Sequence, residues 1–417
     1  MDKMIIYGPT SLKGSVLVSG AKNAALPILA AVLLSDGKNQ ITNVPNLKDI
    51  DTILALLSYL GVRIERKEGT VIADSQGIQR FDAPYELVKT MRASILVLGP
   101  LLTRFKRAKI SLPGGCAIGE RPINLHLMGL EKMGASIRLE EGYVVAEAPR
   151  LYGTSIYFDI PTVTGTENLM MAATLAKGTT VLENVAREPE VEDLANFLNK
   201  MGAKIFGVGT DKIVIEGVER LEAAPYSVMQ DRIEAGTLLI AAAATGGEVE
   251  IKHSNPQYLE AIIEKLRSAG AKILTHQDSI FITSDGTFEK LQVQTQPYPG
   301  FPTDLQAQMM VLLTKAKGTS VMTETIFENR FNHVAELRRM GADIRVDGRS
   351  AIIEGGAFLS GAPVMATDLR ASASLIIAGL LAHGKTEISR VYHLDRGYEA
   401  LHEKLLKLGA RIERGNL

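Results

Sequence analysis

A triplet of a hydrophobic residue, a glycine and a small residue recurs six times along the chain. Each triplet follows a stretch with the hydrophobic spacing of a helix and precedes a stretch that alternates like a strand. Its glycines are 73, 68, 68, 71 and 68 residues apart. The triplets are Leu60-Gly61-Val62, Met133-Gly134-Ala135, Met201-Gly202-Ala203, Ala269-Gly270-Ala271, Met340-Gly341-Ala342 and Leu408-Gly409-Ala410. Such even spacing indicates a duplicated unit of about 70 residues.

A second pattern, a run of small and branched apolar residues, keeps the same period. Because these runs lack a polar face, they predict helices that are buried inside a domain. The glycines that follow most of them predict left-handed C-caps. The runs cover residues 24–34, 93–102, 169–176, 237–245, 309–316 and 372–382.

Each unit also contains patterns typical of an amphipathic helix and short strands. Residues 258–269 predict such a helix, and residues 272–275 and 279–283 predict strands. The fold class is therefore α/β. Six units of this size exceed one hydrophobic core, so we divide them three and three, with a break near residues 220–231.

Composition narrows the class of protein. The 46 Lys and Arg nearly balance the 47 Asp and Glu, which argues against a nucleic-acid coat or a polybasic membrane binder. No apolar run approaches the roughly 20 residues of a membrane span, and the N-terminus has no signal-peptide core. A single cysteine excludes an intrachain disulfide and fits a reducing compartment. We expect a soluble, cytoplasmic protein.

Capping signals precede the buried helices. Ser, Thr and Asp side chains accept hydrogen bonds from free N–H groups in the first turn, and a following Glu or Gln completes a capping box. The candidates are Ser19, Thr164-x-x-Glu167, Asp231-x-x-Glu234, Thr303-x-x-Gln306, and Thr367 or Asp368.

Cations near these helix starts break a local rule, because the helix dipole favours anions there. They are Lys22, Arg92, Arg232 and Arg370. Arg232 has Asp231 and Glu234 as possible partners, and Arg370 has Asp368, so an ion pair and a bound ligand are both open for them. Lys22 and Arg92 have no acid within three residues. For these two we predict a bound phosphate or carboxylate.

Residues 112–122 contain three glycines, two prolines and the only cysteine, Cys116. This composition predicts an exposed loop, in which a thiol near Arg121 would be reactive. The alternative is a small buried residue under a loop, the common fate of a free cysteine. The seven histidines offer neither a protease partner nor metal-ligand spacing, so we predict no metal site.

Motifs in all six units resemble the UDP-N-acetylglucosamine enolpyruvyl transferases. Besides the cysteine loop they are Ser19-Gly20-Ala21-Lys22-Asn23, Met91-Arg92-Ala93-Ser94, Asp231-Arg232-Ile233-Glu234-x-Gly236-Thr237, Phe301-Pro302-Thr303-Asp304-x-Gln306-Ala307-Gln308, Glu328-Asn329-Arg330-Phe331 and Asp368-Leu369-Arg370-Ala371-Ser372-Ala373. The resemblance implies two inside-out α/β barrels of three βαβαββ units each. It places residues 1–21 with 231–417 in one domain and residues 22–230 in the other.

The resemblance also implies a reaction: transfer of the enolpyruvyl group of phosphoenolpyruvate to the 3′-hydroxyl of UDP-N-acetylglucosamine, with release of phosphate. This is the first committed step of bacterial peptidoglycan synthesis, which serves cell shape and division, and its enzyme is the target of fosfomycin. No cofactor, metal or obligate protein partner is implied.

Catalytic roles follow from the same resemblance. Cys116 is implied as the general acid that protonates C3 of phosphoenolpyruvate, and Asp304 as the base that accepts the 3′-hydroxyl proton. The alternative for Asp304 is a simple partner of the helix dipole. Residues implied to bind or orient phosphoenolpyruvate are Lys22, Asn23, Arg121 and Arg396.

Contacts with the sugar nucleotide are implied for a larger set. It consists of Arg92, Arg121, Pro122, Ile123, Asn124, Leu125, Thr162, Val163, Thr164, Asp304 and Ile326. Residues implied to act when the domains close are Asp231, Arg330, Asp368 and Arg370. We expect the Cys116 loop to form the lid that excludes water.

Two alternatives remain open. The sister enolpyruvyl transferase of aromatic amino-acid synthesis takes shikimate phosphate, but its family lacks the Pro-Gly-Gly-Cys loop. A non-catalytic sugar-nucleotide-binding paralogue would be expected to have lost Cys116, Asp304 or Lys22, and this chain retains all three.

Overall fold

A computed structural model describes residues 2–89, 91–112 and 123–415. The chain divides into two compact units. Residues 2–19 and 230–415 form unit 1, and residues 20–112 and 123–229 form unit 2. Each unit has a hydrophobic core of its own. Within the part of the chain that the structure describes, every helix is too short or too polar to cross a bilayer.

The described residues form six four-stranded sheets, three in each unit, and all six have one pairing pattern. In each sheet one edge strand is parallel to its neighbour, and the other pairs of neighbouring strands are antiparallel. This pattern is the structural counterpart of the repeat in the sequence. The predicted strands at 272–275 and 279–283 are confirmed as β18 (Lys272–Thr275) and β19 (Ser279–Thr283).

The sheets of unit 1 are β26 (Pro363–Met365), β27 (Gly384–Ser389), β1 (Lys3–Gly8) and β28 (Ile412–Gly415); β2 (Lys13–Leu17), β17 (Glu248–Lys252), β19 and β18; and β21 (Gln292–Gln294), β23 (Thr319–Thr323), β25 (Ser350–Glu354) and β24 (Asp343–Asp347). The sheets of unit 2 are β7 (Asp82–Ala83), β8 (Arg107–Ser111), β10 (Tyr143–Glu147) and β9 (Ser136–Glu140); β11 (Ser155–Tyr157), β12 (Thr179–Glu183), β14 (Lys212–Glu216) and β13 (Lys204–Phe206); and β16 (Pro225–Ser227), β4 (Lys38–Thr42), β6 (Thr70–Asp74) and β5 (Arg63–Lys67). Two short pairs, β15 (Leu221–Glu222) with β3 (Ser35–Asp36) and β20 (Phe288–Glu289) with β22 (Ala316–Lys317), complete the strands.

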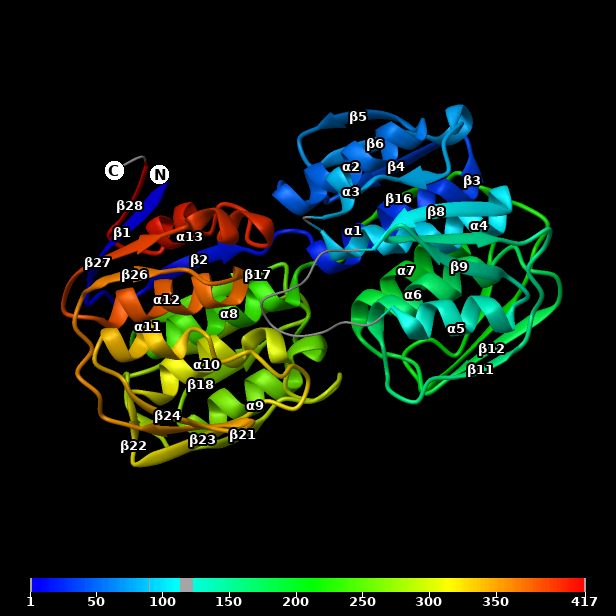
Figure 1. Ribbon diagram of the computed structural model, residues 1–417. Coiled ribbons are helices and arrows are strands. Elements are labelled where there is room, and N and C mark those ends of the chain that lie inside the picture. Colours follow the sequence, from blue (N-terminus) through cyan, green and yellow to red (C-terminus); the bar gives the residue numbers. More distant parts are fainter. Residues whose placement is uncertain (1, 90, 113–122, 416–417) are drawn as a thin grey trace. The chain divides into compact units, whose positions relative to one another are not determined.

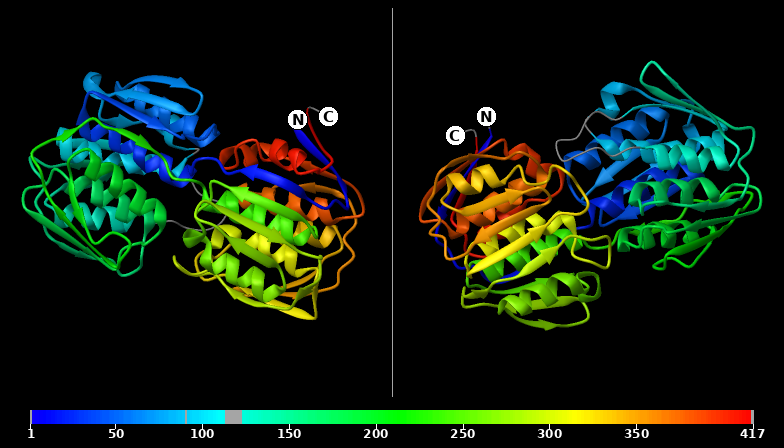
Figure 2. Two further views of the ribbon diagram at one scale, coloured as in Figure 1. Left: turned by 180° about the vertical axis from the view of Figure 1, so that it is seen from behind. Right: turned by 60° about the horizontal axis from the view of Figure 1, so that its bottom comes forward.

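The first strand of the chain lies in the last sheet. β1 runs between β27 and β28 and is antiparallel to both, with Lys3 opposite Ser389 and Gly415. Both views in Figure 2 accordingly show the first and last strands, coloured blue and red, side by side in unit 1. β2 then pairs with β17 before the chain enters unit 2. Unit boundaries lie within two residues of the expected domain boundaries at 21 and 230.

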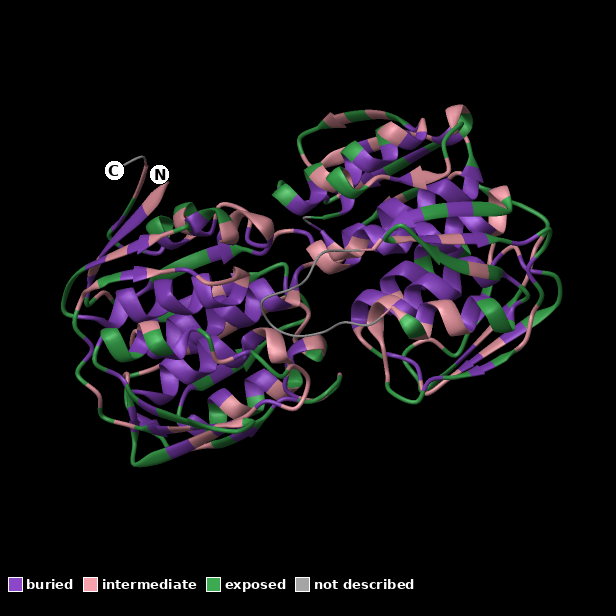
Figure 3. Ribbon diagram, in the orientation of Figure 1, coloured by how far each residue is buried: buried purple, intermediate pink, exposed green. Residues whose placement is uncertain are grey.

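Six buried helices lie inside the two units, surrounded by the sheets (Figures 1 and 3). This confirms the prediction from the apolar runs. The run at residues 93–102 begins as the 3₁₀ helix η3 (Arg92–Val97) rather than as an α-helix. The buried helices are α1 (Lys22–Ala31), α4 (Leu98–Phe105), α6 (Val163–Ala173), α8 (Arg232–Ala244), α10 (Gln306–Leu313) and α12 (Leu369–Leu381). The more exposed helices are α2 (Lys48–Leu60), α3 (Tyr85–Val88), α5 (Asn124–Lys132), α7 (Pro189–Lys200), α9 (Glu260–Ala269), α11 (Val334–Arg339) and α13 (Leu401–Lys407).

Glycine caps some helices at other places than expected. Left-handed C-caps occur after the exposed helices, at Gly61 (φ 110°) and Gly270 (φ 113°). After the buried helix α6 the C-cap is Thr174, and Gly178 (φ 95°) lies in the turn that leads into β12. The prediction of glycine C-caps on the buried helices is therefore wrong for α6, where the left-handed conformation serves the tight turn before the strand. It is confirmed for α8, where Gly246 (φ 62°) directly follows Thr245 and donates its N–H to Ala243 O at 2.9 Å.

Two of the predicted N-caps are confirmed and three are wrong. Asp231 accepts from the N–H groups of the first turn of α8, and Asp368 does so for α12. Thr162, rather than Thr164, caps α6, where it accepts from Gly165 N at 3.2 Å. The helices that follow Ser19 and Thr303 have no side-chain cap. Both hydroxyls instead bind residues far away in the sequence.

Candidate functional site

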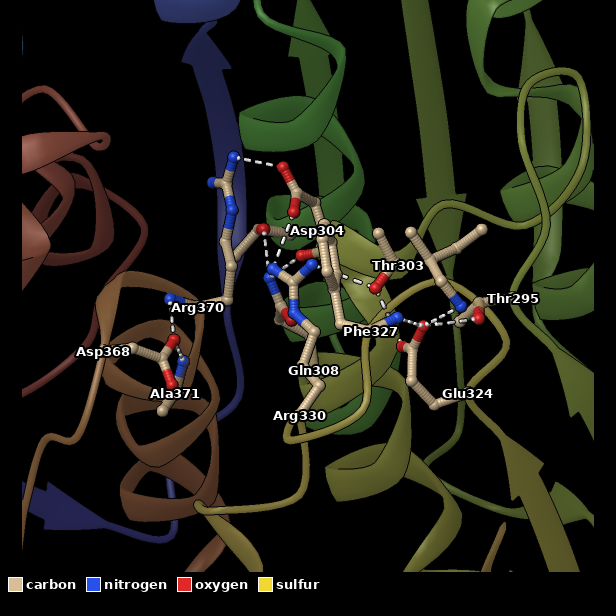
Figure 4. Close-up of polar contacts among 12 residues, drawn as sticks. Thr295, Thr303, Asp304, Gln308, Glu324, Phe327, Arg330, Asp368, Arg370 and Ala371 are labelled. Atoms are coloured by element: carbon tan, nitrogen blue, oxygen red, sulfur yellow. Dashed lines mark hydrogen bonds and ion pairs between the residues drawn. The ribbon is translucent and has the colours of Figure 1, made fainter. Parts of the chain in front are cut away.

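In unit 1 a carboxylate lies between two guanidinium groups. Asp304 Oδ1 accepts from Arg330 Nη2 at 2.6 Å, and Asp304 Oδ2 accepts from Arg370 Nη2 at 2.8 Å (Figure 4). Each arginine side chain is only 6% exposed, whereas the Asp304 side chain is 24% exposed. Burial alone would raise the pKa of Asp304, but the charges of Arg370 and Arg330 outweigh it and hold this pKa well below its usual range. Asp304 is therefore an ionised acceptor.

Each member of this cluster is fixed by a different segment. Asp304 belongs to η5 (Thr303–Leu305), the turn that leads into α10. Arg330 Nη1 also donates to Thr303 Oγ1 at 2.9 Å. The Thr303 hydroxyl then donates to Glu324, whose other oxygen accepts from Ile326 N at 2.8 Å (Figure 4). This chain of contacts fixes the backbone at Ile326, one of the expected sugar contacts.

Arg370 pairs with Asp304 rather than with Asp368. Asp368 uses its carboxylate to cap α12, accepting from Arg370 N at 2.8 Å and Ala371 N at 3.0 Å. The guanidinium of Arg370 turns to Asp304, which lies 66 residues away in the sequence. It also lies 5.2 Å from the centre of the Tyr398 ring. Of the two alternatives left open for Arg370, the ion pair with Asp368 is not formed, because the N-cap geometry of Asp368 satisfies the backbone first.

A network of buried polar side chains contacts the backbone of Asp304. Gln308 Nε2 donates to Asp304 O at 3.0 Å, to Thr237 Oγ1 at 3.1 Å and lies 3.0 Å from the Tyr398 hydroxyl. The hydroxyls of Thr237 and Tyr398 are 2.9 Å apart. Burial raises the pKa of Tyr398, which stays a neutral phenol. We did not predict these residues. The available signals were Thr237, a polar residue at the start of the run 237–245, and Gln308, which directly precedes the run 309–316.

Other residues expected in unit 1 lie near helix ends. Asp231 is buried as the N-cap of α8, and its charge contributes to raising the pKa of Arg370. The Arg232 guanidinium lies 5.5 Å from the centre of the Tyr298 ring. Arg396 is the half-buried last residue of η6 (Val391–Arg396).

In unit 2, Lys22 begins α1 and forms an ion pair. Its Nζ lies 3.2 Å from Asp49 Oδ2, and the two side chains are 11% and 8% exposed. The argument that Lys22 lacks an acidic partner is therefore wrong, since α2 supplies the acid from 27 residues away. Asn23 follows at the second position of α1 and is partly exposed.

Arg92 starts η3, and two of its nitrogens are unsatisfied. Nε and Nη1 are buried and have no hydrogen-bond partner among the described residues. A buried, unpaired guanidinium nitrogen is costly, so this arrangement favours an acceptor supplied by a ligand.

The start of α6 carries the expected contacts Thr162, Val163 and Thr164. Thr164 Oγ1 lies 3.3 Å from Nε2 of His126, a buried residue of α5. α5 itself begins at the expected contacts, with Ile123 as N-cap and Asn124 as its first residue. Its second residue, Leu125, is partly buried.

The remaining expected residues, Cys116, Arg121 and Pro122, lie outside the described residues. The structure thus brings Asp304, Arg330 and Arg370 into one cluster in unit 1. In unit 2 it places Lys22, Arg92 and Thr164 each at the start of a buried or 3₁₀ helix.

The two segments that connect the units lie next to these helix starts, and each is held by a buried carboxylate. In unit 1, Glu234 accepts from Ser19 N at 3.4 Å and pairs with Lys404. In unit 2, Asp193 accepts from the Tyr226 hydroxyl at 2.7 Å and from Met229 N at 3.0 Å. Burial raises the pKa of Glu234 to about 7 and that of Asp193 to about 6. Glu234 was expected to complete a capping box with Asp231, but its carboxylate binds Ser19 N and Lys404 instead.

Comparison with known sequences identifies the family. The profile of the family described as EPSP synthase (3-phosphoshikimate 1-carboxyvinyltransferase) matches residues 6–405. A UDP-N-acetylglucosamine 1-carboxyvinyltransferase of Thermodesulfovibrio yellowstonii is 58% identical over 99% of this chain and 100% of its own length. An enzyme of the same name from Sorangium cellulosum is 58% identical over 99% of both chains.

Solved structures share the fold. The enolpyruvyl transferase NikO from Streptomyces tendae has a TM-score of 0.89 at 24% identity and covers 99% of this chain and 98% of its own. EPSP synthase from Acinetobacter baumannii has a TM-score of 0.75 at 20% identity over both whole chains. The expected mixed α/β fold is thereby confirmed. On the family profile and the full-length relatives, the chain belongs to the EPSP synthase family and, within it, to the UDP-N-acetylglucosamine 1-carboxyvinyltransferases.

Proposed function

We propose that this chain is an enzyme that transfers the enolpyruvyl group of phosphoenolpyruvate to the 3′-hydroxyl of UDP-N-acetylglucosamine. The observation that carries the proposal is 58% identity, over nearly the full length, to enzymes named for that reaction. The geometry of the Asp304 cluster supports it, because an ionised carboxylate held in place by two cations can accept a hydrogen bond from a hydroxyl and so orient it.

The proposed reaction is an addition followed by an elimination. Cys116 donates a proton to C3 of phosphoenolpyruvate, and the 3′-oxygen of the sugar forms a bond to C2 while its proton passes to Asp304. C3 then returns a proton to the Cys116 thiolate, the bond from C2 to the phosphate oxygen breaks, and phosphate leaves with the proton that Asp304 had accepted. The product is the enol ether of the sugar nucleotide, so protons and electrons balance.

Asp304 needs a change of contacts in order to act as a base. A carboxylate that two guanidinium groups stabilise is a weak proton acceptor. We therefore assign it first to orienting the 3′-hydroxyl. Proton transfer then requires that Arg330 or Arg370 weaken its contact with Asp304, for instance by turning toward an anionic substrate group.

The cations of unit 2 are assigned to the anionic parts of the substrates. Lys22, with Asn23 and Arg121, binds the phosphate and carboxylate of phosphoenolpyruvate, and Arg396 of unit 1 is assigned to the same substrate. The start of α6 binds the sugar nucleotide, since its first N–H groups have no partner within the helix. Two buried nitrogens of Arg92 supply further donors. The remaining contacts are those expected at Pro122, Ile123, Asn124, Leu125 and Ile326.

The finer architecture and the cellular role belong to the same proposal. The three sheets and three buried helices of each unit are consistent with an inside-out barrel, and the two units with two domains. The enzyme would act in the cytoplasm on the path to peptidoglycan, and so in cell shape and division. Asp231, Arg330, Asp368 and Arg370 would act as the domains close.

The direct test is release of inorganic phosphate from phosphoenolpyruvate. We expect release with UDP-N-acetylglucosamine and none with shikimate 3-phosphate, together with a product whose mass is increased by one enolpyruvyl group. Release with shikimate 3-phosphate alone would indicate the sister activity. Binding of the sugar nucleotide without any release would indicate a non-catalytic paralogue.

Cys116 can be tested separately by mass spectrometry. Fosfomycin opens its epoxide on a thiolate, so we expect the intact mass to increase by the mass of the drug in the presence of the sugar nucleotide. An unchanged mass, or an adduct that persists in a Cys116→Ser variant, would contradict the role assigned to this thiol.

A further inference from the structure

His126 is a buried histidine that no step above uses. It lies on α5, which neighbours α6 in Figure 1, and it is only 2% exposed. Its ring lies within hydrogen-bond distance of two residues of α6. Its Nδ1 lies 3.0 Å from Asn168 Nδ2, and its Nε2 lies 3.3 Å from Thr164 Oγ1. The ring therefore connects the buried interior of α6 to the first turn of that helix.

The orientation of the Asn168 amide is fixed by two backbone groups. Its Oδ1 accepts from Gly99 N at 2.7 Å, and its Nδ2 donates to Ile95 O at 3.0 Å. A flipped amide would set its NH₂ against the Gly99 N–H and its oxygen against the Ile95 carbonyl, and both contacts would be lost. Only the second proton of Nδ2 remains, and it points to His126 Nδ1.

The tautomer of His126 follows from this arrangement. Nδ1 accepts a proton, so in a neutral ring the single N–H must be on Nε2. Nε2 then donates to Thr164 Oγ1. Burial lowers the pKa of His126 to about 4, which is consistent with a neutral ring at physiological pH.

The hydroxyl proton of Thr164 is therefore available for donation to a further acceptor. The Thr164 oxygen receives the His126 proton, and no described residue accepts the proton of its hydroxyl. Thr164 is also the second residue of α6, where backbone N–H groups have no partner within the helix. Hydroxyl and backbone donors thus lie together in one helical turn.

We infer that His126 is a positioning residue, which fixes the Thr164 hydroxyl as a hydrogen-bond donor to the diphosphate of the nucleotide-sugar substrate. The inference rests on the proposed function for the identity of that substrate. It adds that substrate binding at α6 depends on a tautomer set by Asn168, a residue that touches no ligand in this assignment.

Two pairs of variants test the assignment. His126→Gln keeps a donor near Thr164, and His126→Asn does not reach it. Thr164→Ser keeps the hydroxyl, and Thr164→Val removes it at the same size. The probe is UDP alone, whose binding to the full chain is measured by calorimetry. We expect His126→Asn and Thr164→Val each to weaken UDP binding roughly 10- to 100-fold, as for a hydrogen bond to a charged group. His126→Gln and Thr164→Ser should stay within about threefold of wild type.

The double variant separates positioning from a general structural role. If His126 acts through Thr164, adding His126→Asn to Thr164→Val should weaken UDP binding no further. Additive losses, or UDP binding by His126→Asn equal to that of wild type, would overturn the inference. If His126→Asn fails to fold, the comparison of Thr164→Val, Thr164→Ser and His126→Gln still decides.

Turnover assays keep this test distinct from that of the proposed function. His126→Asn should raise KM for UDP-N-acetylglucosamine, with KM for phosphoenolpyruvate and kcat within about twofold. If wild type released no phosphate, the proposed function would fail, whereas the UDP titrations would still show whether His126 acts through Thr164.

Discussion

The starts of α6 and α10 show how one repeated position has been given two chemistries. In unit 2 this position has Thr164 and, four residues later, Asn168; in unit 1 it has Asp304 and, four residues later, Gln308. Both amides are fully buried; Gln308 donates to Asp304 O, whereas Asn168 contacts His126, which in turn contacts Thr164. The residue one turn earlier differs: it is neutral in unit 2 and charged in unit 1.

The difference teaches which part of the repeat is scaffold and which part is function. The buried amide contacts the helix start directly in unit 1 and through His126 in unit 2, while the residue before it decides between donor and acceptor. At Asp304 two arginines accompany the charge, because a buried carboxylate without a partner is strongly destabilising. At Thr164 a neutral histidine is sufficient, since no charge has to be compensated.

The largest effect is expected at the charged position. Asp304→Asn keeps the shape of the side chain but removes its negative charge, so the 3′-hydroxyl loses its acceptor. We expect kcat to fall about 10²- to 10⁴-fold, the usual contribution of a general base. Phosphate release measures the rate, and circular dichroism checks the fold. A kcat within threefold of wild type would remove Asp304 from the reaction.

A smaller loss is expected at the start of α1. Lys22→Ala removes a cation assigned to phosphoenolpyruvate, so we expect kcat to fall about 10²- to 10³-fold with the fold intact. Lys48→Ala is the matched control, because Lys48 also pairs with an aspartate but its side chain is 72% exposed. If both variants lost activity equally, local charge rather than Lys22 itself would be responsible.

The free energy of unfolding should also distinguish the Asp304 position from the Thr164 position. Arg330→Met leaves the partly buried Asp304 with one partner fewer, and we expect the free energy of unfolding to fall by about 3 kcal/mol. Thr164→Val breaks a neutral hydrogen bond and should cost about 1 kcal/mol. Urea unfolding of both variants measures the difference. Equal losses would contradict the distinction between a charged and a neutral network.

The smallest effect concerns the carboxylates beside the connecting segments. Folding raises the pKa of Glu234 from its ordinary 4.5 to about 7, mainly by burial, against the opposing effect of Lys404, with Asp231 adding to the rise. The folded state therefore holds the proton more tightly, and stability falls as the pH rises between these two values. Between pH 6 and pH 8 wild type should lose about 1 kcal/mol through this group.

Glu234→Gln should abolish that part of the pH dependence. Glu403→Gln is the control, because Glu403 neighbours Lys404 but its side chain is 62% exposed. Urea unfolding at pH 6 and pH 8 gives the comparison. The same slope in wild type and Glu234→Gln would show that Glu234 does not titrate in this range. Asp193, with a pKa of about 6, should act at lower pH.

Sequence patterns predicted the fold better than the contacts of the site. Apolar periodicity located the six buried helices and the strands β18 and β19, because burial imprints a regular spacing on the sequence. The partners of Asp304 lie 26 and 66 residues away from it. Local spacing contains no information on such pairs, which is why only the neighbouring Asp368 was considered as an acidic partner of Arg370.

Capping signals failed for a related reason. Ser19 and Thr303 have the residue types of N-caps, but Lys404 and Glu324 bind their hydroxyls across the fold. His126 gave no signal at all, since a lone histidine between apolar residues has no motif. The roles of Cys116 and Arg121 stay predictions.

The position of β1 between β27 and β28 has a consequence for synthesis on the ribosome. Unit 2 is complete once residue 229 has emerged, whereas β1 finds its first partner only when residues 384–389 follow. At 5–20 residues per second, the apolar segment Met4–Ile6 would wait roughly 20 to 80 s without a partner strand. Nascent chains of this protein should therefore need a chaperone for their amino-terminal segment long after their middle has folded.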